Sequence, residues 1–166
     1  MSEVKNFDAC ITGGGLAGLA LSIQLAKLGY SVALFEKEQY PFHKVCGEYI
    51  SLESWNFIEE LGFPLSGSQL PMIKKLIVTA PNGNELKQEL PLGGFGISRY
   101  KLDAGLKDIA IANKVAVFEN CKVNDIHFAD DEFKLSTSNG DFTCRVCCGS
   151  FGKRSNLDVK WKRRFV

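Results

Sequence analysis

Side chains that serve hydrolytic or metal-dependent catalysis are scarce in this sequence. It contains two histidines, His43 and His127, which stand far apart and lack the partners of a triad or a metal cluster. It also has neither paired carboxylates suited to acid–base catalysis nor a nucleophile elbow. The sequence therefore gives no support to hydrolase chemistry, and the catalytic residues stay unknown.

Long apolar runs are absent as well. The most apolar region, Ala9 to Leu28, is interrupted by a glycine cluster and by Gln24 and Lys27, which argues against a membrane-spanning helix. No charged-then-apolar secretory leader accompanies the six cysteines, so we expect reduced thiols and a cytoplasmic protein. With 45% apolar residues in a chain of 166 and no repeats, the composition indicates one globular core.

The sequence has no large excess of positive or negative residues, and its formal net charge is +1. The charge is nevertheless uneven, with −4 through Gly152 and +5 from Lys153 to Val166. We therefore divide the chain into a domain at 1–152 and a basic tail at 153–166, which we expect to be solvated. Because the tail is short and no basic face adjoins it, nucleic acid is not an expected partner, while peripheral membrane contact stays open.

Three closely spaced cysteines, Cys144, Cys147 and Cys148, raise the question of a zinc site. Such a site needs a fourth ligand and usually a second paired motif, which the sequence lacks. The apolar setting of these cysteines is more typical of a buried strand. We therefore expect no metal.

A glycine loop follows the first apolar segment of the chain. The run Ala9–Thr12 has the character of a short buried strand, and Gly13, Gly15 and Gly18 come directly after it. In a dinucleotide-binding loop the first glycine allows a tight turn, the second lets backbone approach the diphosphate, and the third lets the next helix pack closely. A structural turn with glycines at this spacing is the alternative interpretation.

The residues after the loop complete a βαβ pattern. Apolar residues recur at helical spacing from Leu16 to Leu28, Gly29 follows as a C-cap, and 31–35 is apolar enough for a second buried strand. The helix N-terminus would favour a bound anion. Glu36 ends the second strand at the spacing of an acid that bonds a ribose hydroxyl, and its charge would disfavour NADP in this site.

The remaining chain predicts further α/β elements with two β insertions. A loop at 41–48 precedes a helix at 52–61, a hairpin pairs 73–80 with 85–90, and a helix follows 97–100 and ends at about 112. A short parallel strand at 116–118 and a meander of 121–128, 132–136 and 142–148 follow. The predicted fold class is α/β, a doubly wound, Rossmann-like FAD/NAD(P)-binding fold with an inserted β-hairpin and β-meander.

Four motifs together resemble a known family. They are the glycine loop with Glu36, the loop from Lys44 to Glu48, Ile97-Ser98-Arg99 before a helix, and Gly149-Ser150-Phe151-Gly152 after the meander. The chain resembles the N-terminal part of FAD-dependent oxidoreductases of the geranylgeranyl reductase and aromatic-ring hydroxylase group. The resemblance implies that FAD is bound by Gly13, Gly15, Leu16, Ala17, Gly18, Glu36, Lys37, Lys44, Gly47, Glu48, Arg99, Val123, Gly149 and Gly152.

The resemblance also implies an activity. Flavin would carry the chemistry, with NADH or NADPH as a transient electron donor and an isoprenoid-like, aromatic or polyketide-like small molecule as substrate. Two departures matter: Phe151 stands where the family usually has an acid, and family members are considerably longer. The sequence therefore resembles a fragment, a truncated product or half of a split protein, completed by a second polypeptide or a homo-oligomer. A non-catalytic dinucleotide-binding module is the alternative function.

More ordinary roles stay open for three of these residues. Arg99 could pair with Asp103 on the same helix face, and Lys44 could pair with Glu48 in a solvated loop. Cys46 could be a packing residue near the flavin rather than a nucleophile.

Overall fold

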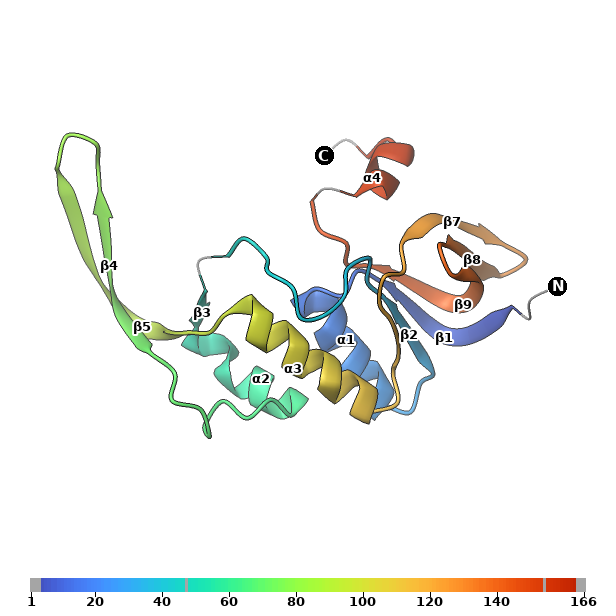
Figure 1. The fold of residues 1–166 in the computed structure, drawn as a ribbon, viewed down its shortest axis with the longest axis horizontal. Helices are drawn as coiled ribbons and strands as arrows, with labels where there is room; N and C mark the ends of the chain where they lie inside the picture. Colours follow the sequence, from blue (N-terminus) through green and yellow to red (C-terminus); the bar gives the residue numbers. More distant parts are fainter. Residues whose placement is uncertain (1–3, 47, 154, 164–166) are drawn as a thin grey trace.

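The computed structural model describes residues 4–46, 48–153 and 155–163. Its main sheet has the strand order β6-β2-β1-β9-β8-β7 (Figure 1). Strands β6, β2, β1 and β9 are parallel, whereas β9, β8 and β7 form an antiparallel meander. Their bounds are Lys5–Thr12 for β1, Val32–Phe35 for β2, Ala116–Phe118 for β6, Val123–Ala129 for β7, Glu132–Thr137 for β8 and Gly140–Gly149 for β9.

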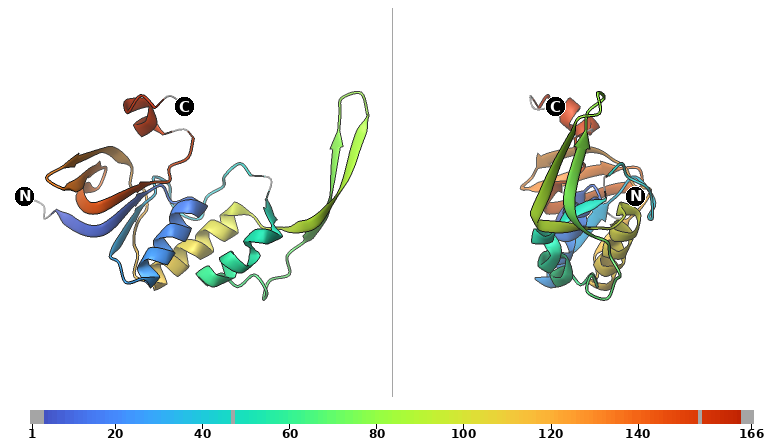
Figure 2. Two further views of the ribbon diagram at one scale, coloured as in Figure 1. Left: turned by 180° about the vertical axis from the view of Figure 1, so that it is seen from behind. Right: turned by 90° about the vertical axis from the view of Figure 1, so that its left-hand side faces the viewer.

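Two helices cover one face of the parallel strands (Figure 2). They are α1, Leu16–Lys27, and α3, Arg99–Ala112, and they contact each other. Because successive strand residues point to opposite faces, Ile11 and Leu34 lie on the helix side, where they join a core with residues such as Leu19 and Leu102. The predicted βαβ unit and the helix after Ser98 are confirmed.

The meander, rather than further helices, covers the other face of the parallel strands. Cys10 and Phe35 point to this side and pack with Ile126, Leu135 and Phe142 of β7, β8 and β9. The Rossmann-like α/β class is thus confirmed, with a meander in place of the second helical layer. The three clustered cysteines of the sequence lie on β9, as the strand interpretation predicted.

A second, smaller sheet has the order β3-β5-β4 and projects from the body as a long hairpin (Figure 1). Its strands are Tyr49–Ser51 for β3, Met72–Thr79 for β4 and Glu85–Gly96 for β5. The hairpin was predicted, but the extension of β5 beyond Leu90 and the strand β3 were not. Residues 49–51 pair with 94–96, so both segments become strands only through a long-range contact.

The helix predicted at 52–61 is divided. A 3-10 turn, Leu52–Ser54, precedes α2, Trp55–Leu61, and the Ser51 hydroxyl caps the turn by accepting the N–H of Glu53. The helix ends as predicted at Gly62, whose φ of 110° lies in the left-handed region.

The basic tail is less solvated than expected. It contains the short helix α4, Asn156–Lys160, which packs on β7, and Leu157 is only 4% exposed because it enters the core under the meander. Lys160 forms an ion pair of 3.1 Å with Asp125.

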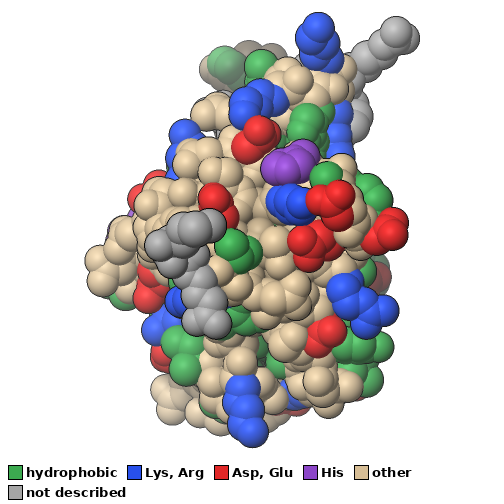
Figure 3. Space-filling model, turned by 90° about the vertical axis from the view of Figure 1, so that its right-hand side faces the viewer, with side chains coloured by type: hydrophobic (Ala, Val, Ile, Leu, Met, Phe, Trp, Pro, Cys, Tyr) green, Lys and Arg blue, Asp and Glu red, His purple; other side chains and the backbone are tan. Residues whose placement is uncertain are grey.

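Acidic and basic side chains are intermixed on the face of the molecule shown in Figure 3. None of the helices in the described parts of the chain is both long and apolar enough to cross a bilayer.

We predict that Gly18→Ala destabilises the protein although alanine favours helices. A Cβ on Gly18 would overlap the carbonyl oxygen of Gly13 and lie 2.6 Å from Ser150 Oγ, so α1 could no longer pack against the loop. The free energy of unfolding, measured by urea denaturation, should fall by about 1–3 kcal/mol.

Gly67→Ala is the matched control, because its Cβ would meet no atom closer than Pro64 O at 3.9 Å. Its stability should change by less than about 1 kcal/mol. Equal stabilities of the two variants would contradict the packing role of Gly18.

Candidate functional site

The carboxyl ends of three parallel strands meet at one edge of the main sheet. Thr12 at the end of β1 is in register with Phe35 of β2 and Gly149 of β9. The loops that leave these strands therefore lie together, as expected for the ligand crevice of an open α/β sheet. They carry the glycine loop, Glu36 and Ser150.

The first glycine of the loop is required by its conformation and by its surroundings. Gly13 has a φ of 108°, and a Cβ there would lie 2.6 Å from the Ser150 backbone. Its N–H donates to the carbonyl of Phe35 at 2.8 Å, and its own carbonyl accepts the Ser150 hydroxyl at 2.5 Å. The loop is thus fixed to both neighbouring strands.

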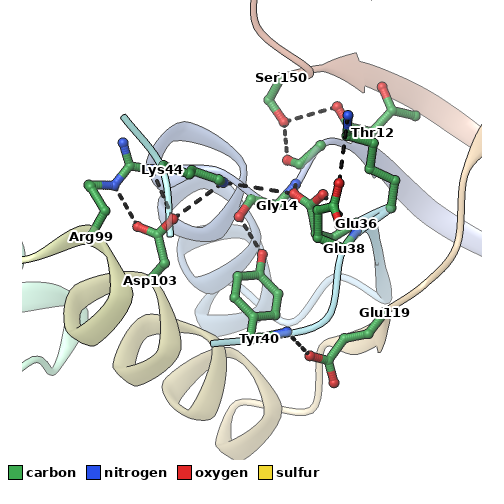
Figure 4. Close-up of polar contacts among 12 residues, drawn as sticks. Thr12, Gly14, Glu36, Glu38, Tyr40, Lys44, Arg99, Asp103, Glu119 and Ser150 are labelled. Carbon is green, nitrogen blue, oxygen red and sulfur yellow. Dashed lines mark hydrogen bonds and ion pairs between the residues drawn. The ribbon is translucent and has the colours of Figure 1, made fainter. Parts of the chain in front are cut away.

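Gly14 is held on its opposite side by Tyr40 and Glu36. The Tyr40 hydroxyl donates to the Gly14 carbonyl, and the Gly14 N–H donates to Glu36 Oε2 at 3.0 Å (Figure 4). Burial, with nearby carboxylates, raises the pKa of Tyr40, so its hydroxyl keeps the proton it donates. A side chain at position 14 would overlap this tyrosine.

Glu36 is 6% exposed and accepts backbone N–H groups through both of its oxygens. Besides Gly14, the N–H of Glu38 donates to its Oε1 at 3.1 Å, and Lys44 Nζ lies 3.9 Å from its Oε2. The carboxylate also lines the cavity described below. Glu36 is therefore a carboxylate held in place by backbone hydrogen bonds beside a cavity.

Gly15 differs from its neighbours because space lies beside it. Its backbone is extended, with φ −77° and ψ −176°, and no side chain caps α1 at this position. A Cβ on Gly15 would meet nothing closer than Lys44 Nζ at 3.9 Å and Arg99 Nη2 at 4.0 Å. The open position thus lies at the positive end of α1 between two cations, an arrangement that suits an anion.

Both cations are held by Asp103 on α3. Arg99 donates to it through Nε at 2.7 Å and Nη2 at 2.9 Å, and Lys44 Nζ lies 3.3 Å from its Oδ2 (Figure 4). Burial opposes the charge of Arg99, but the bonds to Asp103 outweigh it and raise the arginine pKa. The predicted Arg99–Asp103 pair therefore forms, while Lys44 pairs with Glu36 and Asp103 rather than with Glu48.

A cavity of about 820 Å³ adjoins the loop. Its wall includes seven residues of the predicted set, Gly13, Gly15, Glu36, Lys37, Lys44, Val123 and Gly152. The wall also contains apolar side chains, among them Phe35, Cys121, Phe151 and Leu157.

The remaining predicted residues that the structure describes are not part of the cavity wall. Leu16, Ala17 and Gly18 form the first turn of α1, and Gly149 ends β9. Glu48 is exposed, and its N–H donates to Cys46 Sγ at 3.4 Å. Gly47 lies outside the described residues.

Sequence reasoning missed several residues of the site. Ser150 and Tyr40 fix the loop, and Asp103 was considered only as a surface partner of Arg99. Only the parallel pairing of β1 with β9 indicates that position 150 would reach Gly13, and no sequence signal identifies Tyr40.

The site fits a dinucleotide. The open position at Gly15 has cations and a helix terminus that would suit a diphosphate, Glu36 would offer acceptors to a ribose, and the cavity wall includes apolar side chains that a flat base would contact.

Comparisons with known proteins agree with this fold. A family model described as an NAD(P)-binding Rossmann-like domain matches residues 11–46, the βαβ unit with the glycine loop and the segment that follows. The chain therefore has the Rossmann-like nucleotide-binding fold that its sequence predicted.

Several solved structures share the fold of nearly this whole chain. The FAD-dependent chondrochloren halogenase of a myxobacterium superposes with a TM-score of 0.77 at 21% identity, over 93% of this chain and 39% of the halogenase. The p-nitrophenol 4-monooxygenase of Pseudomonas putida superposes with a TM-score of 0.80 at 16% identity, over 95% of this chain and 44% of the monooxygenase. A geranylgeranyl bacteriochlorophyll reductase-like protein of Thermoplasma acidophilum superposes with a TM-score of 0.76 at 18% identity, over 97% of this chain and 43% of that protein. The chain thus spans less than half the length of each.

We predict that Glu36→Gln destabilises the protein even without a ligand. Each Glu36 oxygen accepts a backbone N–H, and a glutamine NH₂ would face one of these donors without a bond. The free energy of unfolding should fall by about 1–3 kcal/mol in urea denaturation.

Glu38→Gln provides the control, because Glu38 is exposed and its carboxylate pairs, among the residues that the structure describes, only with Lys37 at 3.8 Å. Its stability should change by less than about 0.5 kcal/mol. If the Glu36 variant were as stable as this control, the carboxylate would not be fixing the loop.

Proposed function

We propose that this chain binds FAD as the FAD-binding part of a flavin-dependent oxidoreductase. The observation that carries the proposal is the open position at Gly15. The structure needs a glycine at positions 13, 14 and 18 to avoid internal overlap, but at 15 the protein itself would tolerate a side chain. A glycine there is explained by a ligand that approaches the backbone.

The neighbouring residues have separate roles in this proposal. The first turn of α1, at Leu16 and Ala17, presents N–H groups to the diphosphate together with Arg99 and Lys44. Glu36 accepts ribose hydroxyls, and its charge favours a ribose without a 2′-phosphate.

The adenine would occupy the part of the cavity beside Val123 and Cys121. Lys37 and Gly152 also line the cavity, and we retain Gly149, Gly47 and Glu48 as proposed cofactor contacts.

The flavin, when bound, would supply the electron transfer, with NADH or NADPH as the donor. This chain's own residues bind and orient the cofactor, and none is assigned as a catalytic acid or base. The superposed proteins are a halogenase, a monooxygenase and a reductase-like protein. We accordingly propose reduction or oxygenation of an isoprenoid-like, aromatic or polyketide-like small molecule.

The rest of such an enzyme would come from further polypeptide, in the same chain, a second chain or a homo-oligomer. We propose a cytoplasmic location, since all six cysteines are free thiols.

A second candidate is a dinucleotide-binding module without turnover, because the part of the chain that the structure describes offers groups that would bind a dinucleotide and none that we assign as a catalytic acid or base. The two candidates differ in reduction of the bound flavin. We expect NADH or NADPH to bleach the visible absorbance of protein-bound FAD under anaerobic conditions if the chain is a competent oxidoreductase part. Bound FAD that dithionite bleaches, but neither nicotinamide nucleotide does, would favour the module.

We predict that Gly15→Ala weakens FAD binding without weakening the fold. The backbone at Gly15 is open to alanine, so stability should change by less than about 1 kcal/mol. A methyl group between the loop and a diphosphate would cost about 1–3 kcal/mol, a loss of about 5- to 150-fold in affinity, measured by quenching of FAD fluorescence.

Gly67→Ala, in a turn remote from the cavity lining, should bind FAD like the wild type. If wild-type protein did not quench FAD at all, the proposed function would fail. If Gly15→Ala bound as tightly as the wild type, the diphosphate would not lie at this position.

A further inference from the structure

We infer that Asp103 is a positioning residue for the cofactor: it holds Arg99 and Lys44 over the glycine loop, ready for the diphosphate. This inference rests on the proposed function and adds to it a residue that contributes to cofactor affinity through two others.

The geometry of Asp103 is that of a fixed support. It lies on α3 one turn after Arg99, is 2% exposed, and its neighbour Leu102 is fully buried in the core. Its Oδ1 accepts Arg99 Nε, and its Oδ2 accepts Arg99 Nη2 with Lys44 Nζ at 3.3 Å (Figure 4). Because the guanidinium is bonded at two atoms, its plane is set by the carboxylate.

The donors that Asp103 leaves unused are close to the open position of the loop. An arginine has five N–H groups, and the pair with Asp103 uses the Nε–H and one N–H of Nη2. The same Nη2 lies 4.0 Å from the position of a Cβ on Gly15, and Lys44 Nζ lies 3.9 Å from it. Both cations therefore stand beside the place where a diphosphate would lie, although they come from different parts of the chain.

Asp103 has two opposite effects on the binding of an anion. They predict affinity changes of opposite sign when the carboxylate is removed. Its charge repels a diphosphate and competes for the same two cations, so charge alone predicts that removing it tightens binding. Fixing two long side chains lowers the entropy that binding must otherwise lose, so positioning predicts weaker binding after removal. We infer that positioning prevails, because the carboxylate is neutralised by two cations and bonded to both in fixed geometry.

The test is Asp103→Asn, with affinities for FAD, ADP and adenosine measured by calorimetry or fluorescence. Because the two cationic side chains lose their fixed positions, the affinities for FAD and ADP should each fall about tenfold. Adenosine, which has no phosphate, should bind equally to variant and wild type. Asp108→Asn is the matched control, because Asp108 lies on the same helix, is exposed and, within the described parts of the chain, pairs only with Lys107.

A second variant keeps the test valid if Asp103→Asn unfolds. Arg99→Lys retains the positive charge but loses the two-point bond to Asp103, so ADP should again bind about tenfold more weakly. In the Arg99→Lys background, Asp103→Asn should cause a smaller loss of ADP affinity than it does in the wild type, because part of its effect passes through the arginine.

The outcomes separate this inference from the proposed function. A wild type that binds neither FAD nor ADP overturns both. A wild type that binds both, with a folded Asp103→Asn variant that binds ADP as tightly or more tightly, overturns the inference alone. An equal loss of affinity for adenosine also overturns the inference, because the effect of Asp103 would then not pass through the cations that face the phosphates.

Discussion

The site depends on a backbone loop that can lie between its neighbours only because it has no side chains. Gly13 approaches Ser150, Gly14 approaches Tyr40 and Glu36, and the carbonyl of Gly13 approaches Gly18 of α1. These contacts leave no freedom to the loop, and they leave the one open position, Gly15, at the N-terminus of the helix. The shape of the binding site is thus set by steric exclusion before any charge is considered.

Charge then acts on a scaffold that is already rigid. Glu36 and Asp103 are both buried, and a buried carboxylate is stable only when hydrogen-bonded or paired. Backbone N–H groups satisfy Glu36, and two cations satisfy Asp103. Lys44 connects the two carboxylates, so the proposed ribose and diphosphate ends form one network (Figure 4). Such a network would be preorganised for the anionic ligand that we propose.

Local patterns predicted the parts of the fold that local forces determine. The strand, glycine loop, helix and acid follow each other along the chain, and each has its own periodicity or turn chemistry. The three strands of the meander were equally predictable from the sequence. Strand β3 was not, because three residues show no alternation, and neither was α4, whose Leu157 is buried by β strands far away in the sequence.

The sequence by itself determined the Rossmann-like βαβ unit, the acid at its end and the presence of a nearby loop that carries Lys44. Only the tertiary structure decided that Ser150 and Tyr40 fix the loop and that Asp103 joins Arg99 to Lys44. The physical reason is separation along the chain: the hydrogen bond from Ser150 to Gly13 spans 137 positions. No local pattern records such contacts, since they form when the sheet brings the ends of its strands together.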